Sequence, residues 1–141
     1  MAIVFGAEAR NVARDRWRDV VLGYTCANDV TARDLQKKDV QFTRGKGFDT
    51  FCPLGPCIET ELDPSHLAIA TRVNGATRQD GNTSQMIFDC GFLIEFVTSV
   101  MTMLPGDVIL TGTPAGVGPL VAGDVVEVTV EGIGTLRNVV A

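Results

Sequence analysis

The chain has 141 residues, of which 45% are hydrophobic, 21% charged and 6% aromatic. This length fits one domain that can bury roughly two thirds of its unfolded surface. The net charge is −5 and the basic residues are scattered, which argues against a nucleic-acid partner, because such a surface needs a concentrated basic patch. No apolar run approaches the roughly 18 residues of a membrane span, and no signal peptide is recognisable. We therefore expect a cytoplasmic protein with no membrane partner.

The hydrophobic patterns predict a chain of short strands with few helices. Strands are expected at residues 2–6, 24–30, 51–60 (irregular or at a sheet edge), 67–73, 76–79, 108–110, 125–130 and 135–140. Helices are expected at 13–21, just after Thr31 and at 89–101, and loops at 37–49 and 111–118. Seven or eight strands with two or three short helices indicate an α+β domain that is mostly β.

Three local signals fix parts of this pattern. Asn74-Gly75 is a strong two-residue hairpin turn between two predicted strands. Asp89 is a candidate N-cap for the helix that follows it. Thr31 is predicted to cap a short helix in a capping box with Asp34.

The cysteines at positions 26, 52, 57 and 90 form no CxxC motif and no zinc-type pattern with the single histidine, His66. We interpret them as buried, reduced thiols, with a disulfide or a metal cluster as the alternatives. His66 follows a polar turn and is expected at the surface.

The stretch 23–56 contains an unusual mixture of side chains. Asp29 lies in a small, apolar predicted strand and is expected to be buried there, where a carboxylate is costly unless it is paired or coordinated. It could hold a metal or cap backbone amides. Lys46 lies between two glycines, which would let a bound anion come close, although a solvated loop lysine is the plain alternative. Arg33 and Gln36 are three apart on a predicted helix and point the same way; Arg33 could also pair with Asp34 or Asp29.

The glycine-rich segment TGTPAG (111–116) resembles a phosphate-binding loop only weakly. It lacks the GK[ST] ending and a following helix. A tight turn between strands is the alternative interpretation.

Five stretches of the chain form a recognisable set: GYTCANDVTARDLQ (23–36), GKGFDTFCPLGP (45–56), RVNGATRQDGNTSQMIF (72–88), PGDVILTGTPAGVG (105–118) and VEGIGTLRN (130–138). Together they resemble the fumarylacetoacetate hydrolase family, in its branch of acylpyruvate hydrolases and hydroxymuconate-type isomerases and decarboxylases. The resemblance covers nearly the whole chain, but the N-terminal part of the family is missing. Residues 1–141 are thus expected to be an N-terminally truncated catalytic domain with the mixed β-sandwich roll of the family, and a homodimer.

The resemblance also implies a metal site. In the family, the aspartate at the place of Asp29 binds a divalent cation, Mg²⁺ or Mn²⁺, with Ca²⁺ as a further candidate. Two more glutamates come from a Glu-x-Glu pair before a strand like residues 2–6, and a histidine–glutamate pair in the hydrolases lies further upstream. Neither pair is in this chain, and Glu8 does not fit the pattern. We expect weak metal binding by these residues alone.

By the same resemblance, Lys46 is a catalytic residue that contacts the substrate or a metal-bound water, and Arg33, Gln36 and Thr113 bind the substrate. The implied reaction is hydrolysis of a C–C bond in a small anionic 2-oxo or 1,3-diketo acid, of acylpyruvate or fumarylpyruvate type, through a metal-stabilised enolate. The alternatives within aromatic-compound catabolism are a 2-hydroxyhepta-2,4-diene-1,7-dioate isomerase and a 5-carboxymethyl-2-oxo-hex-3-ene-1,7-dioate decarboxylase. An alternative of another class is a non-catalytic fragment or scaffold subunit with an incomplete site.

Overall fold

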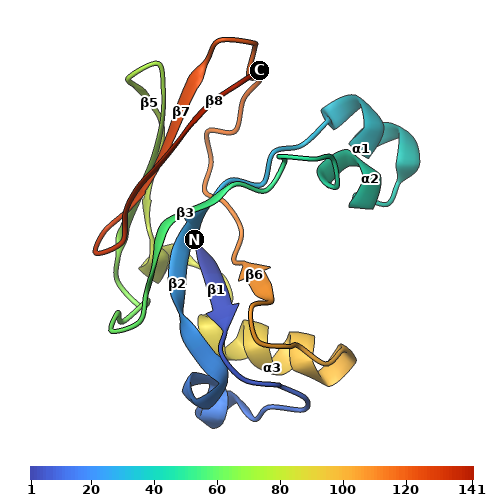
Figure 1. The fold of residues 1–141 in the computed structure, drawn as a ribbon, viewed down its shortest axis with the longest axis vertical. Coiled ribbons are helices and arrows are strands. Elements are labelled where there is room, and N and C mark those ends of the chain that lie inside the picture. Colours follow the sequence, from blue (N-terminus) through green and yellow to red (C-terminus); the bar gives the residue numbers. More distant parts are fainter.

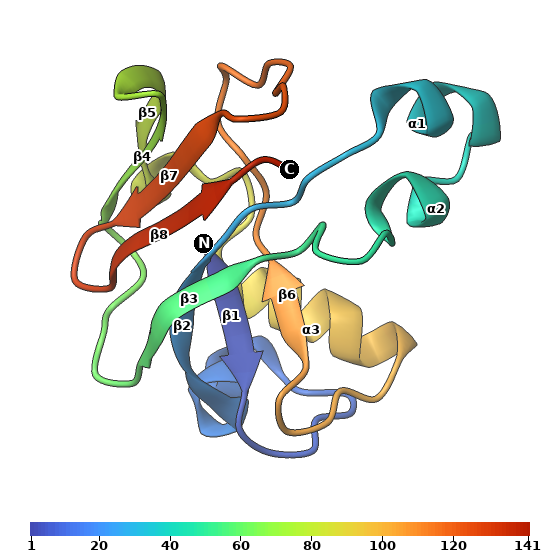
Figure 2. The same ribbon diagram turned by 45° about the horizontal axis from the view of Figure 1, so that its top comes forward.

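The fold is built from two four-stranded antiparallel sheets, shown in Figures 1 and 2 in a computed structural model that describes all residues from 1 to 141. The first sheet has the strand order β3-β2-β1-β6 and the second β5-β4-β7-β8. The strands are β1 (Ala2–Phe5), β2 (Val21–Ala27), β3 (Leu54–Glu59), β4 (Ala68–Val73), β5 (Ala76–Asn82), β6 (Val108–Leu110), β7 (Val125–Val130) and β8 (Gly134–Val139). The helices are α1 (Arg33–Asp39), α2 (Thr43–Lys46) and α3 (Cys90–Val100), with 3₁₀ turns η1 (Arg14–Val20) and η2 (Thr83–Gln85). The α+β class with mostly β structure is confirmed.

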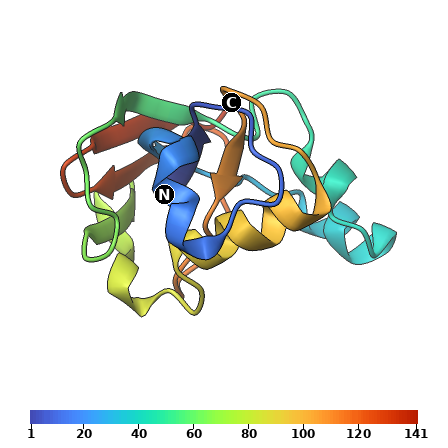
Figure 3. The ribbon, with the colours of Figure 1, turned by 90° about the horizontal axis from the view of Figure 1, so that it is seen from below.

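The hydrophobic core lies around β1, whose four residues are all buried. Ile3 and Phe5 belong to one apolar cluster with Trp17 of η1, Ile94 of α3 and Val128 of β7. Figure 3 shows η1 and α3 side by side beneath the first sheet. Because β1 is covered on both faces, it reads as a continuous apolar run rather than an alternating one.

The second sheet shows the alternation of a half-buried sheet. Val126, Val128 and Val130 of β7 are buried, and the residues between them are partly exposed. The hairpin between β4 and β5 turns at Asn74 (φ 53°) and Gly75 (φ 79°), and positive φ at both positions suits a two-residue hairpin turn. The hairpin prediction is thereby confirmed.

Residues 28–53, named the arm here, leave the first sheet between β2 and β3 and carry α1 and α2. Figures 1 and 2 show both helices standing away from the two sheets. Backbone hydrogen bonds close the base of the arm: Asn28 N–H donates to the Pro53 carbonyl (3.2 Å), and Val30 N–H donates to the Phe51 carbonyl (3.0 Å). The base of the arm thus continues the β2–β3 pairing past the end of β2 and the start of β3.

The glycine-rich loop, residues 111–118, packs against β5. Gln79 Nε2 donates to Thr113 Oγ1 and to the Pro114 carbonyl, both at 2.8 Å. Gly116 has φ +105°, and a Cβ built there would lie 2.0 Å from the Arg78 carbonyl oxygen. The backbone of the loop therefore lies so close to β5 at residue 116 that only glycine fits there.

Several element boundaries differ from the sequence-based predictions. The strand expected at 24–30 is β2, which begins at Val21 and ends at Ala27, because the chain turns into the arm at that point. The segment 37–49, predicted as a loop, contains the end of α1 and all of α2. The Thr31–Asp34 capping box was wrong: the N-cap of α1 is Ala32, without a side-chain hydrogen bond, and the Thr31 hydroxyl bonds to the Asp29 carbonyl instead.

The remaining predictions mostly hold. The predicted helix 13–21 is the 3₁₀ turn η1, and β5 continues to Asn82, beyond the predicted end at residue 79. Asp89 is confirmed as the N-cap of α3, because its carboxylate accepts from Phe92 N–H at 2.8 Å. None of the helices has the length and apolar character needed to cross a membrane.

The fold makes a paired prediction for the glycine-rich loop. Gly116→Ala should lower the free energy of unfolding by at least about 1 kcal/mol, because a strained φ alone costs about 1–3 kcal/mol and the new Cβ overlaps the Arg78 carbonyl. Gly118→Ala should change it by less than about 0.5 kcal/mol, since nothing lies within 4 Å of a Cβ at that position. Urea unfolding of both variants measures the difference. Equal stability of the two variants would contradict the packing of this loop on β5.

Candidate functional site on the arm

The arm brings Asp29 and Lys46 together. The Lys46 ammonium forms an ion pair with Asp29 Oδ2 and donates to the Thr31 hydroxyl at 3.2 Å. The two paired side chains are partly open to solvent, with 45% of Asp29 and 30% of Lys46 exposed. The prediction that Asp29 lies buried in a strand was wrong, because β2 ends two residues earlier and the carboxylate stands on the exposed base of the arm.

The glycines on either side of Lys46 position it by packing. Ala32 N–H donates to the Gly45 carbonyl at 2.8 Å. A Cβ on Gly45 would lie 3.3 Å from the Ala32 carbonyl oxygen and from Gln36 N, and a Cβ on Gly47 would lie 2.9 Å from the Thr43 carbonyl oxygen. Residue 45 therefore lets α2 approach α1 closely, which places the lysine over Asp29.

Arg33 and Gln36 are on one face of α1, as predicted. Arg33 Nη1 donates to Gln36 Oε1 at 2.8 Å. Arg33 is exposed, and the alternative that it pairs with Asp34 or Asp29 is wrong, because neither carboxylate lies within ion-pair distance of it. The guanidinium thus keeps donors free for an external acceptor.

A second ion pair that the sequence analysis missed holds the connection between α1 and α2. Arg44 Nε and Nη2 donate to the two oxygens of Asp39, each at 2.6 Å. The hydrogen bonds from Arg44 lower the pKa of Asp39. No local pattern indicates this contact, since the two residues are five apart and a non-helical turn separates them.

Thr113 belongs to the body of the molecule rather than to the arm. It is exposed on the glycine-rich loop, and its hydroxyl accepts from Gln79. That bond leaves the O–H of Thr113 available as a donor. Gln79 is a further residue that the sequence analysis missed, because it is 34 positions from its partner.

The donor set for a divalent cation is incomplete within residues 1–141. Nowhere do three or more His, Cys, Asp or Glu side chains come together in a metal-binding arrangement. Asp29 supplies one carboxylate, with the Thr31 hydroxyl nearby, whereas Mg²⁺ takes about six oxygen ligands. These residues alone do not fit a complete metal centre.

Other candidate groups lie elsewhere. His66 is exposed in the turn before β4, as predicted. Cys26 and Cys90 are buried, but Cys52 and Cys57 are exposed, so the prediction of four buried thiols was wrong for two of them. A pocket of about 440 Å³ lies between η1 and the start of α3 and is lined by none of the predicted site residues.

Comparisons with known proteins place the chain. Residues 1–141 match the family described as fumarylacetoacetate (FAA) hydrolase C-terminal. The chain is similar to the crystal structure of 5-carboxymethyl-2-hydroxymuconate delta-isomerase from Mycobacterium smegmatis, with 57% identity and a TM-score of 0.98, covering 99% of this chain and 56% of that one. Maleylpyruvate hydrolase from Sphingobium is 40% identical with a TM-score of 0.91, over 99% of this chain and 52% of the other.

Among curated sequences, the oxaloacetate tautomerase YisK of Bacillus subtilis is 44% identical over an alignment of 148 positions, which covers 98% of this chain and 49% of that protein. The chain thus spans only about half the length of such relatives. With the family match over its whole length and the same two-sheet fold in the solved structures, the chain belongs to the fumarylacetoacetate hydrolase family.

Proposed function

We propose that this chain is the C-terminal catalytic part of an enzyme that hydrolyses a C–C bond of a small 2-oxo or 1,3-diketo acid, with an enolate as the carbon leaving group. The observation that carries the proposal is the arm, where Asp29 at the base pairs with Lys46 of α2 and where Arg33 and Gln36 share one face of α1. The family match supports it.

The arm residues suit an anionic substrate. The Arg33 guanidinium has donors left to bind a substrate carboxylate, and charge-assisted hydrogen bonds of this kind are strong and directional. Gln36 Oε1 holds that guanidinium in place. The Lys46 ammonium would lie beside the oxygen on which negative charge develops, where a preorganised cation lowers the barrier most.

The glycine-rich loop would complete the substrate site from the body. Thr113, oriented by Gln79, can donate its O–H to a carboxylate oxygen. Because Gln79 fixes the loop from β5, the donor is held without a loss of entropy when the substrate binds.

We propose that Asp29 is one ligand of a divalent cation, Mg²⁺ or Mn²⁺, and that the other protein ligands come from outside these 141 residues. When bound, such an ion would act as a Lewis acid toward the substrate oxygens. In the structure the Lys46 ammonium pairs with this carboxylate, so such an ion and the ammonium would compete for Asp29.

A second reaction on the same enolate is isomerisation or tautomerisation. It is favoured by the similarity to the Mycobacterium smegmatis isomerase and to the Bacillus subtilis tautomerase. Both reactions need the arm residues in the same roles, and they differ in how the enolate forms. In hydrolysis, water adds to the acyl carbonyl and the C–C bond breaks to give a carboxylic acid and an enolate, which then takes a proton on carbon. In isomerisation or tautomerisation, a C–H proton is removed to give the enolate and a proton is returned, with no C–C bond broken. The cytoplasmic location and the homodimer stay predictions.

In a protein where this chain is joined to the segment that supplies the other metal ligands, Lys46→Met should lower kcat for acetopyruvate hydrolysis, assayed as release of acetate and pyruvate with Mg²⁺ present. We expect a loss of about 10²–10³-fold, the cost of removing one preorganised donor from a developing oxyanion. Lys38→Met, an exposed lysine on α1, is the matched control and should keep the rate of the unchanged chain.

Exchange of the substrate C–H for deuterium in D₂O, followed by NMR on pyruvate, separates the two reactions. Exchange without hydrolysis supports the isomerase or tautomerase. Neither exchange nor hydrolysis by the well-folded protein with those ligands supplied would support the non-catalytic alternative, and a Lys46→Met variant as active as the control would overturn the role of the lysine.

Metal binding tests the role of Asp29 without an activity assay. Calorimetric titration with Mn²⁺ should show weak binding that Asp29→Asn abolishes and Asp49→Asn leaves unchanged. Lys46→Met should strengthen Mn²⁺ binding by up to about fivefold, because it removes an exposed ion pair worth about 0.2–1 kcal/mol that competes for the same carboxylate. Binding that persists in Asp29→Asn would exclude this carboxylate as a ligand.

A further inference from the structure

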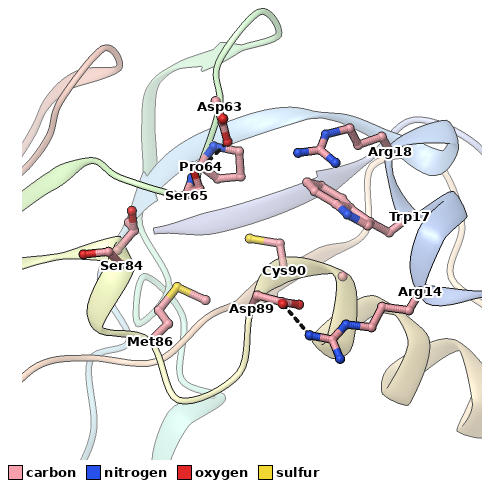
Figure 4. A pocket seen from close by; sticks show the side chains of 12 residues that line it. Arg14, Trp17, Arg18, Asp63, Pro64, Ser65, Ser84, Met86, Asp89 and Cys90 are labelled. Carbon is pink, nitrogen blue, oxygen red and sulfur yellow. Dashed lines mark hydrogen bonds and ion pairs between the residues drawn. The ribbon is translucent and has the colours of Figure 1, made fainter.

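The pocket of about 440 Å³ has three walls (Figure 4). Trp17 and Arg18 of η1 form one, and Asp63, Pro64 and Ser65 of the turn before β4 face them. The floor is the start of α3 with the preceding segment, including Met86 and Asp89. The size suits a small molecule, since ligand pockets typically measure about 300–1,000 Å³.

Most charged groups of the lining already have partners. Arg14 forms an ion pair with Asp89 at 2.5 Å, and Asp89 also caps α3 through Phe92 N–H. Asp63 accepts from Ser65 N–H at 3.1 Å, and its hydrogen bonds to Ser65 lower its pKa. Both carboxylates are thus ionised and occupied at neutral pH.

Arg18 is the exception. Its guanidinium lies over the Trp17 ring, 4.3 Å from the ring centroid, and it has no carboxylate within ion-pair distance. Figure 4 shows it projecting toward the Asp63 side of the pocket. A cation stacked on an aromatic face keeps its in-plane N–H donors free for a planar acceptor.

The platform beneath Arg18 is rigid. Trp17 is 9% exposed and packs against Gly91, where a Cβ would lie 2.8 Å from Trp17 Cδ1. Gly91 is in the first turn of the 11-residue helix α3, so the positive end of the helix dipole also faces the pocket. Asp89 already caps this end of the helix and pairs with Arg14, so the positive charge left for a ligand is that of Arg18.

The charge balance limits the ligand to one negative charge. Only Arg18 is unpaired, and a second anionic group would face Asp63 or Asp89 without a cation of its own. The apolar surfaces of Trp17, Pro64 and Met86 can hold a short hydrocarbon part. A phosphate or a dicarboxylate fits this lining less well than a monocarboxylate does.

We propose that this pocket is a second ligand site, separate from the arm, that binds a small monocarboxylic acid through the guanidinium of Arg18. The carboxylate pairs with Arg18, and the apolar tail lies against Trp17 and Met86. The site does not depend on the proposed function, since it shares no residue with it.

Butyrate is the probe, with butyramide as its uncharged isostere and succinate as the dianion. Trp17 is the only tryptophan, so its indole N–H gives one isolated signal in a ¹H–¹⁵N spectrum of the chain. Butyrate should shift this signal and those of Ser84 and Gly91, with a Kd in the millimolar range that suits so small a ligand. Butyramide should not shift them, and succinate should bind several-fold more weakly.

Arg18→Ala should weaken butyrate binding at least tenfold. Arg16→Ala is the matched control, because Arg16 is on the same 3₁₀ turn, pairs with Asp19 and does not line the pocket. The affinity of the Arg16→Ala variant for butyrate should stay unchanged. The spectra themselves report whether each variant is folded.

Three results would overturn the proposal: equal shifts with butyramide, butyrate shifts confined to the arm, or unchanged affinity in Arg18→Ala. Size-exclusion chromatography distinguishes a pocket that binds a free acid from a pocket that is filled by a side-chain carboxylate of a second copy of the chain. The elution volume should not change in Arg18→Ala, and a change of oligomeric state would show that a side chain of a second copy fills the site instead.

Discussion

The contact between Lys46 and Asp29 is the interaction on which the candidate site depends, yet an exposed ion pair is worth only about 0.2–1 kcal/mol. Its geometry therefore has to come from the backbone around it. The Ala32–Gly45 hydrogen bond and the absence of a Cβ at residue 45 bring α2 onto α1. The bidentate Arg44–Asp39 pair then closes the connection between the two helices. The lysine is positioned by this packing, and its charge is left available for chemistry.

The proposed site is divided between two parts of the fold, which different contacts hold in place. The arm carries the charged groups and stands away from the sheets. The glycine-rich loop carries Thr113 and is fixed to β5 through Gln79 and Gly116. In the proposed reaction, the arm supplies the cationic groups and the loop supplies the Thr113 hydroxyl as a further donor to the substrate carboxylate. The pocket at Arg18 is separate from both parts.

Local patterns predicted the elements whose environment is set by neighbours in sequence. The alternating valines of β7, the Asn74-Gly75 turn and the Asp89 cap all have the predicted structure. The burial of Asp29 was mispredicted, because the point where the chain leaves the sheet depends on the pairing of β2 with β3. Gln79 and Arg44 were missed since their partners are set by tertiary packing. The glycines beside Lys46 were noticed, but for ligand access rather than for helix packing.

We propose that the arm and the glycine-rich loop face one bound anion, with Asp29 as a metal ligand. Paramagnetic broadening by Mn²⁺, followed in ¹H–¹⁵N spectra in the presence of pyruvate, tests this arrangement. Mn²⁺ should broaden the amide signals of both Lys46 and Thr113, the signals of the turn between β7 and β8 should stay sharp, and Asp29→Asn should remove the effect. Broadening at Lys46 with an unaffected Thr113, or broadening that survives Asp29→Asn, would contradict the shared site.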